Sequence, residues 1–185
     1  PTGKLFSIIT EEKDKIFLTT YTLESESKNK RAIINFEKIL DFSYSDDGKK
    51  FAMSAIQKGQ SDIFVFTAAS NAYDQITKDI YDDLNPRFVH GSNELIFSSN
   101  RPTDTIRFED AGNWKKQLPQ TNDLFIYNYT YKSNILRRLT NTPFVNEVRP
   151  AHYDSIHYAY LTDQNGIYNR FMANYDTIIS YVDTS

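Results

Sequence analysis

The sequence contains no cysteine among its 185 residues, which excludes disulfide bonds and metal sites built on thiolates. It also lacks any apolar run near the roughly 18 residues that a membrane-spanning helix needs. Basic residues are not in excess, because 21 lysines and arginines stand against 24 aspartates and glutamates. The sequence therefore provides no broad positive field, and we expect neither a nucleic-acid partner nor insertion into a membrane.

Aromatic residues, by contrast, are abundant, since the sequence has 13 phenylalanines and 13 tyrosines beside a single tryptophan. Aromatic side chains suit half-buried pleated surfaces. The apolar residues occur in short runs that alternate with polar residues, and no run keeps a helical period over a long stretch. Composition and alternation together predict an all-β fold in a chain of ordinary domain size.

An internal repeat makes this prediction more specific. Phe51 and Met53 recur 44 positions later as Leu95 and Phe97, and repeats of this size are typical of solenoids, arrays and propeller blades. Each unit consists of short strands separated by turns, and Asp47-Gly48 is a dipeptide that favours a tight hairpin. The unit is therefore predicted to be a four-stranded antiparallel blade, with these four repeated apolar residues buried between blades.

Two complete blades are predicted, at residues 41–77 and 84–140. A degenerate blade occupies about residues 4–40, and a partial blade covers 149–176. Closed propellers typically have 4 to 8 blades. We count three to four blades in this chain. Because both ends of the sequence fall inside a unit, we expect it to be part of a larger propeller. The remaining blades or domains are expected elsewhere in the same polypeptide.

Several segments of the repeat carry a family resemblance. Ser43–Phe51 has a Ser-Asp-Asp-Gly-Lys turn before an apolar strand, Arg138–Thr140 ends a unit with Leu-Thr, and Arg149–Ala151 opens one with proline. These features resemble the WD-like repeats of the TolB-type β-propeller family, although the proline of that family's turn is absent here. The resemblance implies an exported protein of a Gram-negative bacterium, periplasmic or on the cell surface, that binds other proteins.

One segment departs from the repeat and is a candidate for function. Ser54 to Asp62 spans 8 positions, whereas the matching stretch from Ser98 to Asp123 spans 25, so about 17 extra residues form an insertion at 102–121. Long loops on rigid scaffolds often carry function. Tryptophan and arginine are favoured at binding hot spots. We therefore place Arg101, Arg107 and Trp114 on a protein-binding face.

The linkers between blades are expected on the same face as this insertion. In a four-stranded meander, the loop between strands two and three emerges beside the connection from strand four to the next blade. One such linker carries Asp82 and Asp83, and another carries Phe144 and Glu147. The candidate face for a protein or peptide ligand thus combines the insertion with Asp82, Asp83 and Glu147.

Signatures of enzyme chemistry are missing. The sequence has no Gly-x-Ser-x-Gly elbow and no glycine-rich phosphate loop. The repeat register is not expected to bring His90, His152 and His157 together as metal ligands. We expect no catalytic residue, no cofactor and no metal, and we interpret the chain as a non-enzymatic protein-interaction scaffold.

Two other functions stay open at the level of sequence. The chain could be the substrate-gating propeller of a peptidase whose catalytic domain lies outside it. It could also be a polysaccharide-active propeller lyase, which would need histidines and acidic residues clustered near the propeller axis.

Overall fold

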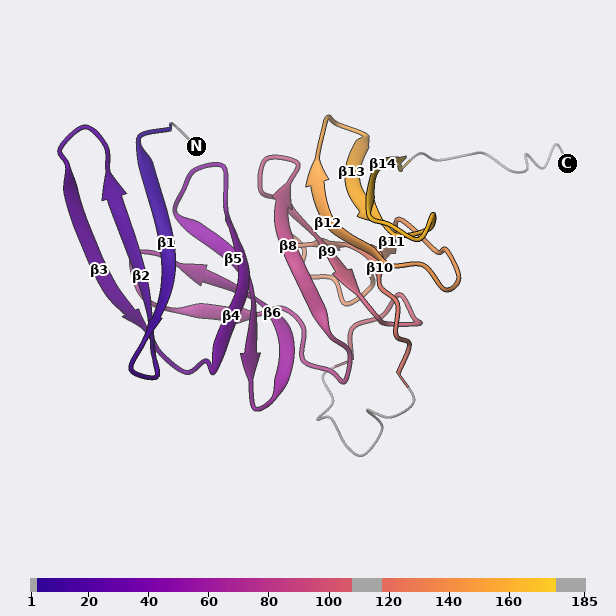
Figure 1. The fold of residues 1–185 in the computed structure, drawn as a ribbon, viewed down its shortest axis with the longest axis horizontal. Coiled ribbons are helices and arrows are strands. Elements are labelled where there is room, and N and C mark those ends of the chain that lie inside the picture. Colours follow the sequence, from indigo (N-terminus) through magenta and orange to yellow (C-terminus); the bar gives the residue numbers. More distant parts are fainter. Residues whose placement is uncertain (1–2, 108–117, 176–185) are drawn as a thin grey trace, which may run out of the picture.

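The computed structural model describes residues 3–107 and 118–175. Within these residues the structure is all-β, with four antiparallel sheets and no helix, as the alternating pattern predicts. Accordingly, no helix in the described ranges is long and apolar enough to cross a membrane. The sheets follow one another along the molecule in chain order, from β1–β3 to β12–β14 (Figure 1).

Each sheet is a simple meander in which consecutive strands pair. Sheet 1 contains β1 (Leu5–Glu12), β2 (Lys15–Thr22) and β3 (Ser27–Ile33), and sheet 2 contains β4 (Lys38–Tyr44), β5 (Lys50–Gln57), β6 (Gln60–Thr67) and β7 (Tyr73–Gln75). Sheet 3 contains β8 (Asp83–Val89), β9 (Glu94–Ser99), β10 (Asp123–Asn128) and β11 (Arg137–Arg138), and sheet 4 contains β12 (Glu147–His152), β13 (His157–Thr162) and β14 (Asn169–Asn174). This is the architecture of consecutive propeller blades.

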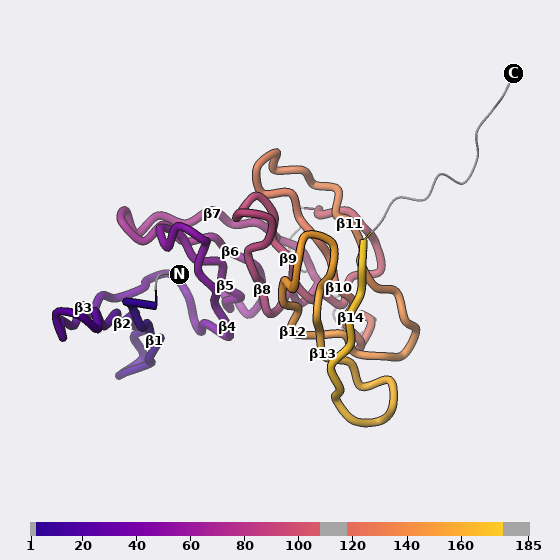
Figure 2. Tube along the Cα trace, turned by 90° about the horizontal axis from the view of Figure 1, so that it is seen from above, coloured from indigo at the N-terminus to yellow at the C-terminus, as the bar shows by residue number. Residues whose placement is uncertain are grey.

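The sequence repeat corresponds to equivalent strand registers. Tyr44 pairs with Phe51 in sheet 2, and Phe88 pairs with Leu95 at the same place in sheet 3. The hairpin between β4 and β5 turns at Gly48, whose φ of 68° is in the left-handed region that glycine adopts without strain. The first strands also lie side by side, because β8 contacts β4 on one side and β12 on the other. Figure 2 shows the same succession from above.

Apolar side chains fill the three spaces between successive sheets. Alternation sends Phe51 and Met53 toward sheet 1, where they meet Leu18, while Ala52 faces sheet 3 on the opposite side. The second cluster joins residues of sheets 2 and 3, and the third joins Ile96 of sheet 3 to Tyr158 of sheet 4, which is 1 % exposed. The four repeated apolar residues are all fully buried, as predicted: Phe51, Met53, Leu95 and Phe97.

The substitution Phe97→Ala tests this packing. Phe97 is fully buried between sheets 2 and 3, so truncation removes apolar contact and leaves a cavity, with an expected loss of about 3–5 kcal/mol in the free energy of unfolding. Denaturant titration measures this loss. Tyr131→Ala is the control, because Tyr131 is 81 % exposed and a surface truncation changes stability by about 0.5 kcal/mol or less. Equal midpoints for both variants would contradict the placement of Phe97.

Candidate functional site

Three connections meet at one end of the sheets. The linker from β7 to β8 is held to the loop after β9, because the backbone N–H of Asp82 donates to Oδ1 of Asn100 at 2.9 Å. The amide of Asn100 donates in turn to the carbonyl of Pro119 at 3.2 Å. The linker before β12 joins them through two hydrogen bonds. The backbone N–H of Glu147 donates to the carbonyl of Asn122, and the backbone N–H of Asn122 donates to Oδ1 of Asn146. These hydrogen bonds bring the two linkers together with residues 118–122 of the insertion and its end.

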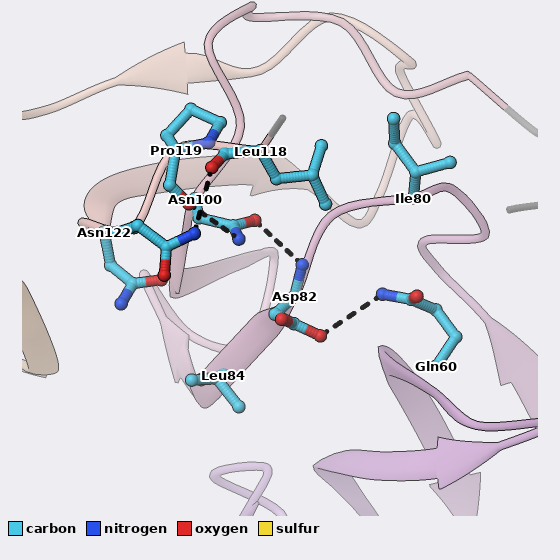
Figure 3. A pocket seen from close by; sticks show the side chains of 9 residues that line it. Gln60, Ile80, Asp82, Leu84, Asn100, Leu118, Pro119 and Asn122 are labelled. Atoms are coloured by element: carbon cyan, nitrogen blue, oxygen red, sulfur yellow. Dashed lines mark hydrogen bonds between the residues drawn. The ribbon is translucent and has the colours of Figure 1, made fainter. Parts of the chain in front are cut away.

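A pocket of about 250 Å³ opens between these connections (Figure 3). Asp82 lies between Asn100 and Gln60 in this view, and hydrogen bonds join it to both. Apolar side chains complete the walls. The lining residues are Gln60, Ile80, Asp82, Leu84, Asn100, Leu118, Pro119, Gln120 and Asn122.

Beneath this end of the molecule, Arg101 is buried with two carboxylates. Its guanidinium donates to both oxygens of Asp83 at 2.8 Å and to Asp79 at 3.1 Å, and its Nε donates to Ser99 Oγ at 3.0 Å. Arg101 is 1 % exposed, and Asp83 is fully buried. Since Asp79 belongs to the linker and Ser99 ends β9, the guanidinium joins the linker to sheet 3 from within.

A third carboxylate, that of Asp62 in β6, lies beside those of Asp79 and Asp83. Burial, with the negative charges of Asp83 and Asp79, raises the pKa of Asp62 to about 8. Burial and Asp83 also raise the pKa of Asp79. The carboxylate oxygens of these three aspartates come within 4.8 Å of one another, a spacing that could suit a metal ion. The guanidinium of Arg101 already pairs with Asp79 and Asp83, so we assign these two aspartates to the ion-pair network. Asp62 instead accepts hydrogen bonds from Thr77 and Gln75.

The hydrogen bonding of this junction recurs one junction later. The side-chain oxygen of Thr77 accepts from the backbone N–H of Ile63 at 2.9 Å, and Thr140 accepts from Leu124 at the same distance. The Leu-Thr end of the repeat therefore has a structural role. Its threonine ties each linker to the third strand of the preceding sheet.

Among the described residues, the second junction has no counterpart of the buried arginine. Gln164 occupies the equivalent position. Its backbone N–H donates to the hydroxyl of Thr162 at 3.4 Å, just as the backbone N–H of Arg101 donates to the hydroxyl of Ser99 at 3.3 Å. Glu147 occupies the position of Asp83 at the start of β12. Its Oε2 is buried with no donor among the described residues. Burial raises the pKa of Glu147, which is consistent with an acid that lacks a cation.

The structure separates the sequence-predicted face residues into two groups. Asp82 and Arg107 are exposed, whereas Arg101, Asp83 and Glu147 are at most 2 % exposed. These three side chains therefore lie inside the molecule and do not form the surface that the sequence analysis expected. Arg101 and Asp83 pair with each other, and Oε1 of Glu147 accepts a hydrogen bond from Thr142 of its own linker at 3.0 Å, a role that spacing alone does not reveal. Trp114 lies outside the described residues.

Part of the insertion packs on its own sheet. Ile106 is 3 % exposed and joins the core between sheets 2 and 3. Its backbone N–H donates to Asn134 O at 2.8 Å, and the N–H of Leu136 donates to Asp104 O at 2.7 Å. The first residues of the insertion thus extend the sheet beside β11 rather than forming a free loop.

The most exposed large apolar side chain among the described residues is Phe144, which is 95 % exposed. It lies in the linker before β12, and its φ of 63° is in the left-handed region, which is unusual for a bulky residue. Ile167 and Tyr168, 68 % and 54 % exposed, lie in the turn after β13. The backbone N–H of Asn146 donates to Oδ1 of Asp163 at 2.7 Å, and this hydrogen bond connects the linker to that turn. We refer to Phe144, Ile167 and Tyr168 as the apolar rim.

Two of the histidines, His90 in the turn after β8 and His152 at the end of β12, approach each other. The rings of His90 and His152 are 5.3 Å apart. Nδ1 of His90 is 2.6 Å from Glu94, and its Nε2 is 3.0 Å from the hydroxyl of Tyr158. Both ring nitrogens of His90 are therefore occupied, and the contacts link sheet 3 to sheet 4.

Comparison with solved structures reveals close similarity of fold. TolB from Acinetobacter baumannii matches with a TM-score of 0.67 over 92 % of this chain and 38 % of that chain, at 15 % identity. Putative TolB from Agrobacterium tumefaciens matches with a TM-score of 0.66 over 88 % of this chain and 51 % of that chain, also at 15 % identity. This chain has the TolB-type β-propeller fold. It spans about 38 % and 51 % of the length of these two TolB chains.

The TolB-type fold is shared with propellers of other proteins. A puromycin-hydrolyzing peptidase from Mycobacterium tuberculosis matches with a TM-score of 0.59 over 94 % of this chain and 29 % of that chain, at 11 % identity. No family model matches the sequence. No curated protein matches it either. At these identities, the likeness to the solved structures establishes the fold and leaves function to the site.

The buried ion-pair network gives a prediction for Arg101→Met. Removing the guanidinium leaves Asp79 and Asp83 buried without their cation, which is expected to cost about 3–5 kcal/mol in the free energy of unfolding. Arg107→Met is the matched control, because Arg107 is exposed six residues away. Chemical denaturation of both variants measures the difference. Similar stability of the two would show that Arg101 does not hold the junction.

The raised pKa of Asp62 gives a prediction for pH. The folded protein keeps a proton on Asp62 up to about pH 8, whereas the unfolded chain releases it near pH 4. This group therefore contributes stability below about pH 4 that is lost as the pH rises to about 8.

Asp62→Asn should remove that loss, because the amide is neutral at every pH. The melting temperature of the variant, relative to wild type, should rise between pH 5 and pH 8 by about 3 °C or more, since 1 kcal/mol shifts a domain of this size by about 2–4 °C. Asp46→Asn, at an exposed turn, should leave the pH dependence as it is. Parallel pH profiles for wild type and Asp62→Asn would refute the assignment.

Proposed function

We propose that this chain is a non-enzymatic protein-interaction segment of a larger exported protein, periplasmic or on the surface of a Gram-negative bacterium. The proposed ligand is a protein or peptide. The binding face is the end of the sheets that carries the pocket and the apolar rim. Localisation and export are inferred from the resemblance to TolB-type proteins. Since this chain spans only part of the length of the TolB chains, the partners of the whole protein are proposed as well.

The observation that carries the proposal is Phe144. An aromatic side chain that is 95 % exposed gains nothing from burial in this chain, and its left-handed backbone costs free energy. Strained backbone of this kind is found preferentially at functional sites, and phenylalanine is enriched at protein interfaces. A partner that covers Phe144 would gain the apolar burial that the isolated chain lacks.

The surroundings of Phe144 support the same face. Ile167 and Tyr168 add exposed apolar surface in the turn to which Asn146 connects the linker of Phe144. Asn122, which lines the pocket, is bonded to the same Asn146. An apolar contact area beside polar groups that fix orientation is the usual composition of a recognition site.

A second candidate is the substrate-gating propeller of a peptidase. The observation that favours it is the likeness to the puromycin-hydrolyzing peptidase and to the β-propeller domain of the Trilobed protease from Pyrococcus furiosus, which matches at a TM-score of 0.50. The two candidates differ in what the rest of the polypeptide contains. A hydrolase domain with a serine nucleophile would favour gating.

Selection of peptides from a random display library on the immobilised chain tests the proposal. We expect peptides that bind wild type and lose affinity about tenfold or more with Phe144→Gly, as for a hot-spot residue. Glycine relieves the left-handed strain, so the melting temperature should be unchanged or higher. This combination of lost binding and retained stability is not expected of a merely structural residue.

Tyr131→Gly is the control for the selection, because Tyr131 is also highly exposed but lies in the loop after β10. It should leave peptide affinity unchanged. Trp114→Ala tests the residue that the sequence analysis placed at the hot spot. Failure to recover any peptide, or affinities equal in wild type and Phe144→Gly, would overturn the proposal for this face.

A further inference from the structure

We propose that the apolar rim is controlled by a proton shared between the carboxyl groups of Glu147 and Asp123. Protonated Glu147 holds the linker that presents Phe144, and ionised Glu147 releases it. This inference rests on the proposed function, because it names a regulation of the same face. Three observations carry it: anchors on both sides of Phe144, a single cation for two carboxyl groups, and a buried oxygen without a donor.

The linker that carries Phe144 is held on both sides of this residue. Before it, Thr142 donates from its backbone N–H to Oδ1 of Asp123 at 3.3 Å and from its hydroxyl to Oε1 of Glu147 at 3.0 Å. After it, the backbone N–H and the side-chain amide of Asn146 donate to a carboxylate in the turn after β13, at 2.7 and 3.0 Å. The left-handed backbone of Phe144 depends on these anchors, because strained backbone persists only where its surroundings hold it.

The hydrogen bonds of Thr142 place the carboxyl groups of Glu147 and Asp123 side by side. Glu147 begins β12 and Asp123 begins β10, and these two strands are in contact. One cation serves both groups among the described residues, because Arg138 pairs with Asp123 and no ion pair reaches Glu147. Two adjacent ionised carboxylates repel each other, so a pair of this kind retains one proton.

The buried oxygen points to Glu147 as the group that carries this proton. Glu147 is 2 % exposed, and its Oε2 has no hydrogen-bond donor in the described part of the chain. A buried carboxylate oxygen without a donor is costly, whereas a protonated carboxyl group is itself a donor and needs only an acceptor. The carboxylate of Asp123, which is hydrogen-bonded to Glu147, is that acceptor.

The electrostatic surroundings favour the protonated form of Glu147. Burial raises its pKa and the negative charge of Asp123 raises it further, while the hydroxyls of Thr140 and Thr142 act in the opposite direction. Tyr160 of β13 also faces this group, and burial followed by the charge of Glu147 raises the pKa of Tyr160, so the phenol stays neutral. Glu147 therefore loses its proton above the ordinary pKa of glutamic acid, which is about 4.3.

Loss of the proton removes the hydrogen bond between the two carboxyl groups and leaves two negative charges beside the anchor. Their repulsion separates Glu147 from Asp123, so Thr142 no longer bonds both. Phe144 then leaves its left-handed conformation, and the apolar rim loses its most exposed side chain. Because the anchored form binds the proton more tightly, binding at the rim is strongest at acidic pH and weakens as the pH rises through the raised pKa of Glu147.

The first experiment follows the proton in the intact chain without any partner. With ¹³C placed only in the carboxyl groups of glutamate, the buried aspartates of the other junction give no signal. We expect one signal to titrate with a midpoint above about 4.3 and to be absent in Glu147→Gln. Asp123→Asn should lower this midpoint, because the amide removes a negative charge and can donate to Oε2. Asp46→Asn, at a distant exposed turn, should leave it in place. A midpoint for Glu147 at or below the ordinary value would overturn the inference.

The second experiment tests the connection to the rim on the backbone amide signals of Thr142 and Phe144 in the ¹⁵N-labelled chain. In wild type, both signals should shift with the midpoint of Glu147. Glu147→Gln should lack that shift, because its amide accepts from Thr142 and donates to Asp123 at every pH, as the protonated acid does. Titration of Glu147 without a matching shift of Phe144 would show that the proton does not control the rim.

The last arm uses a peptide recovered when the selection described above is run at acidic pH. Its affinity for wild type should fall about tenfold or more when Glu147 ionises, as for the loss of a hot-spot contact, and its affinity for Glu147→Gln should stay constant. A peptide that depends on Phe144 but not on the ionisation of Glu147 would overturn this inference while the proposed face stands. A failed selection together with coupled titration of Glu147 and Phe144 would instead overturn the face and retain the proton switch.

Discussion

The position of the proposed binding face depends on one cation buried beneath it. Arg101 bonds Asp79 in the linker, Asp83 at the start of β8 and Ser99 at the end of β9. A linker of polar residues has little apolar surface to hold it against a sheet. The guanidinium supplies instead several directional, charge-assisted hydrogen bonds in a dry environment, where they are strong. Asp82 and the pocket are therefore presented by a fixed segment rather than by a mobile one.

The fold could be predicted from the sequence because its signals are local and repeated. Alternation in segments such as Lys50–Ser54, the Asp47-Gly48 turn and the 44-residue period all indicate the same meander. The face was predicted only in part. Asp82, Asp83 and Arg101 do come together, but whether each carboxylate points outward or inward depends on the linker's path. A one-residue step from Asp82 to Asp83 reverses that direction, and sequence spacing does not fix where the strand begins.

Exposed and unsatisfied groups at the proposed binding face were the hardest features to predict. Phe144 is an ordinary residue in the sequence, and its importance arises from exposure and a left-handed backbone. Gln60 begins the buried strand β6, and its Oε1 has no donor in the described chain because its Nε2 is held by acceptors from residues 81 and 82. Both properties come from tertiary contacts between segments far apart in the chain. Propensity and periodicity, which describe neighbours along the chain, carry no signal for them.

The unequal chemistry of the two junctions has a consequence for how the sheets come apart. Stacked repeats gain stability mainly from nearest-neighbour interfaces. Sheet 3 meets sheet 2 through a paired guanidinium, whereas it meets sheet 4 through Glu147, whose Oε2 has no donor in the described chain, and Gln164. Of these two junctions, the one between sheets 3 and 4 therefore has no ion pair among the described residues. An opening confined to it exposes the amide hydrogens of β12–β14 to exchange with solvent and leaves β5, β6 and β9 closed.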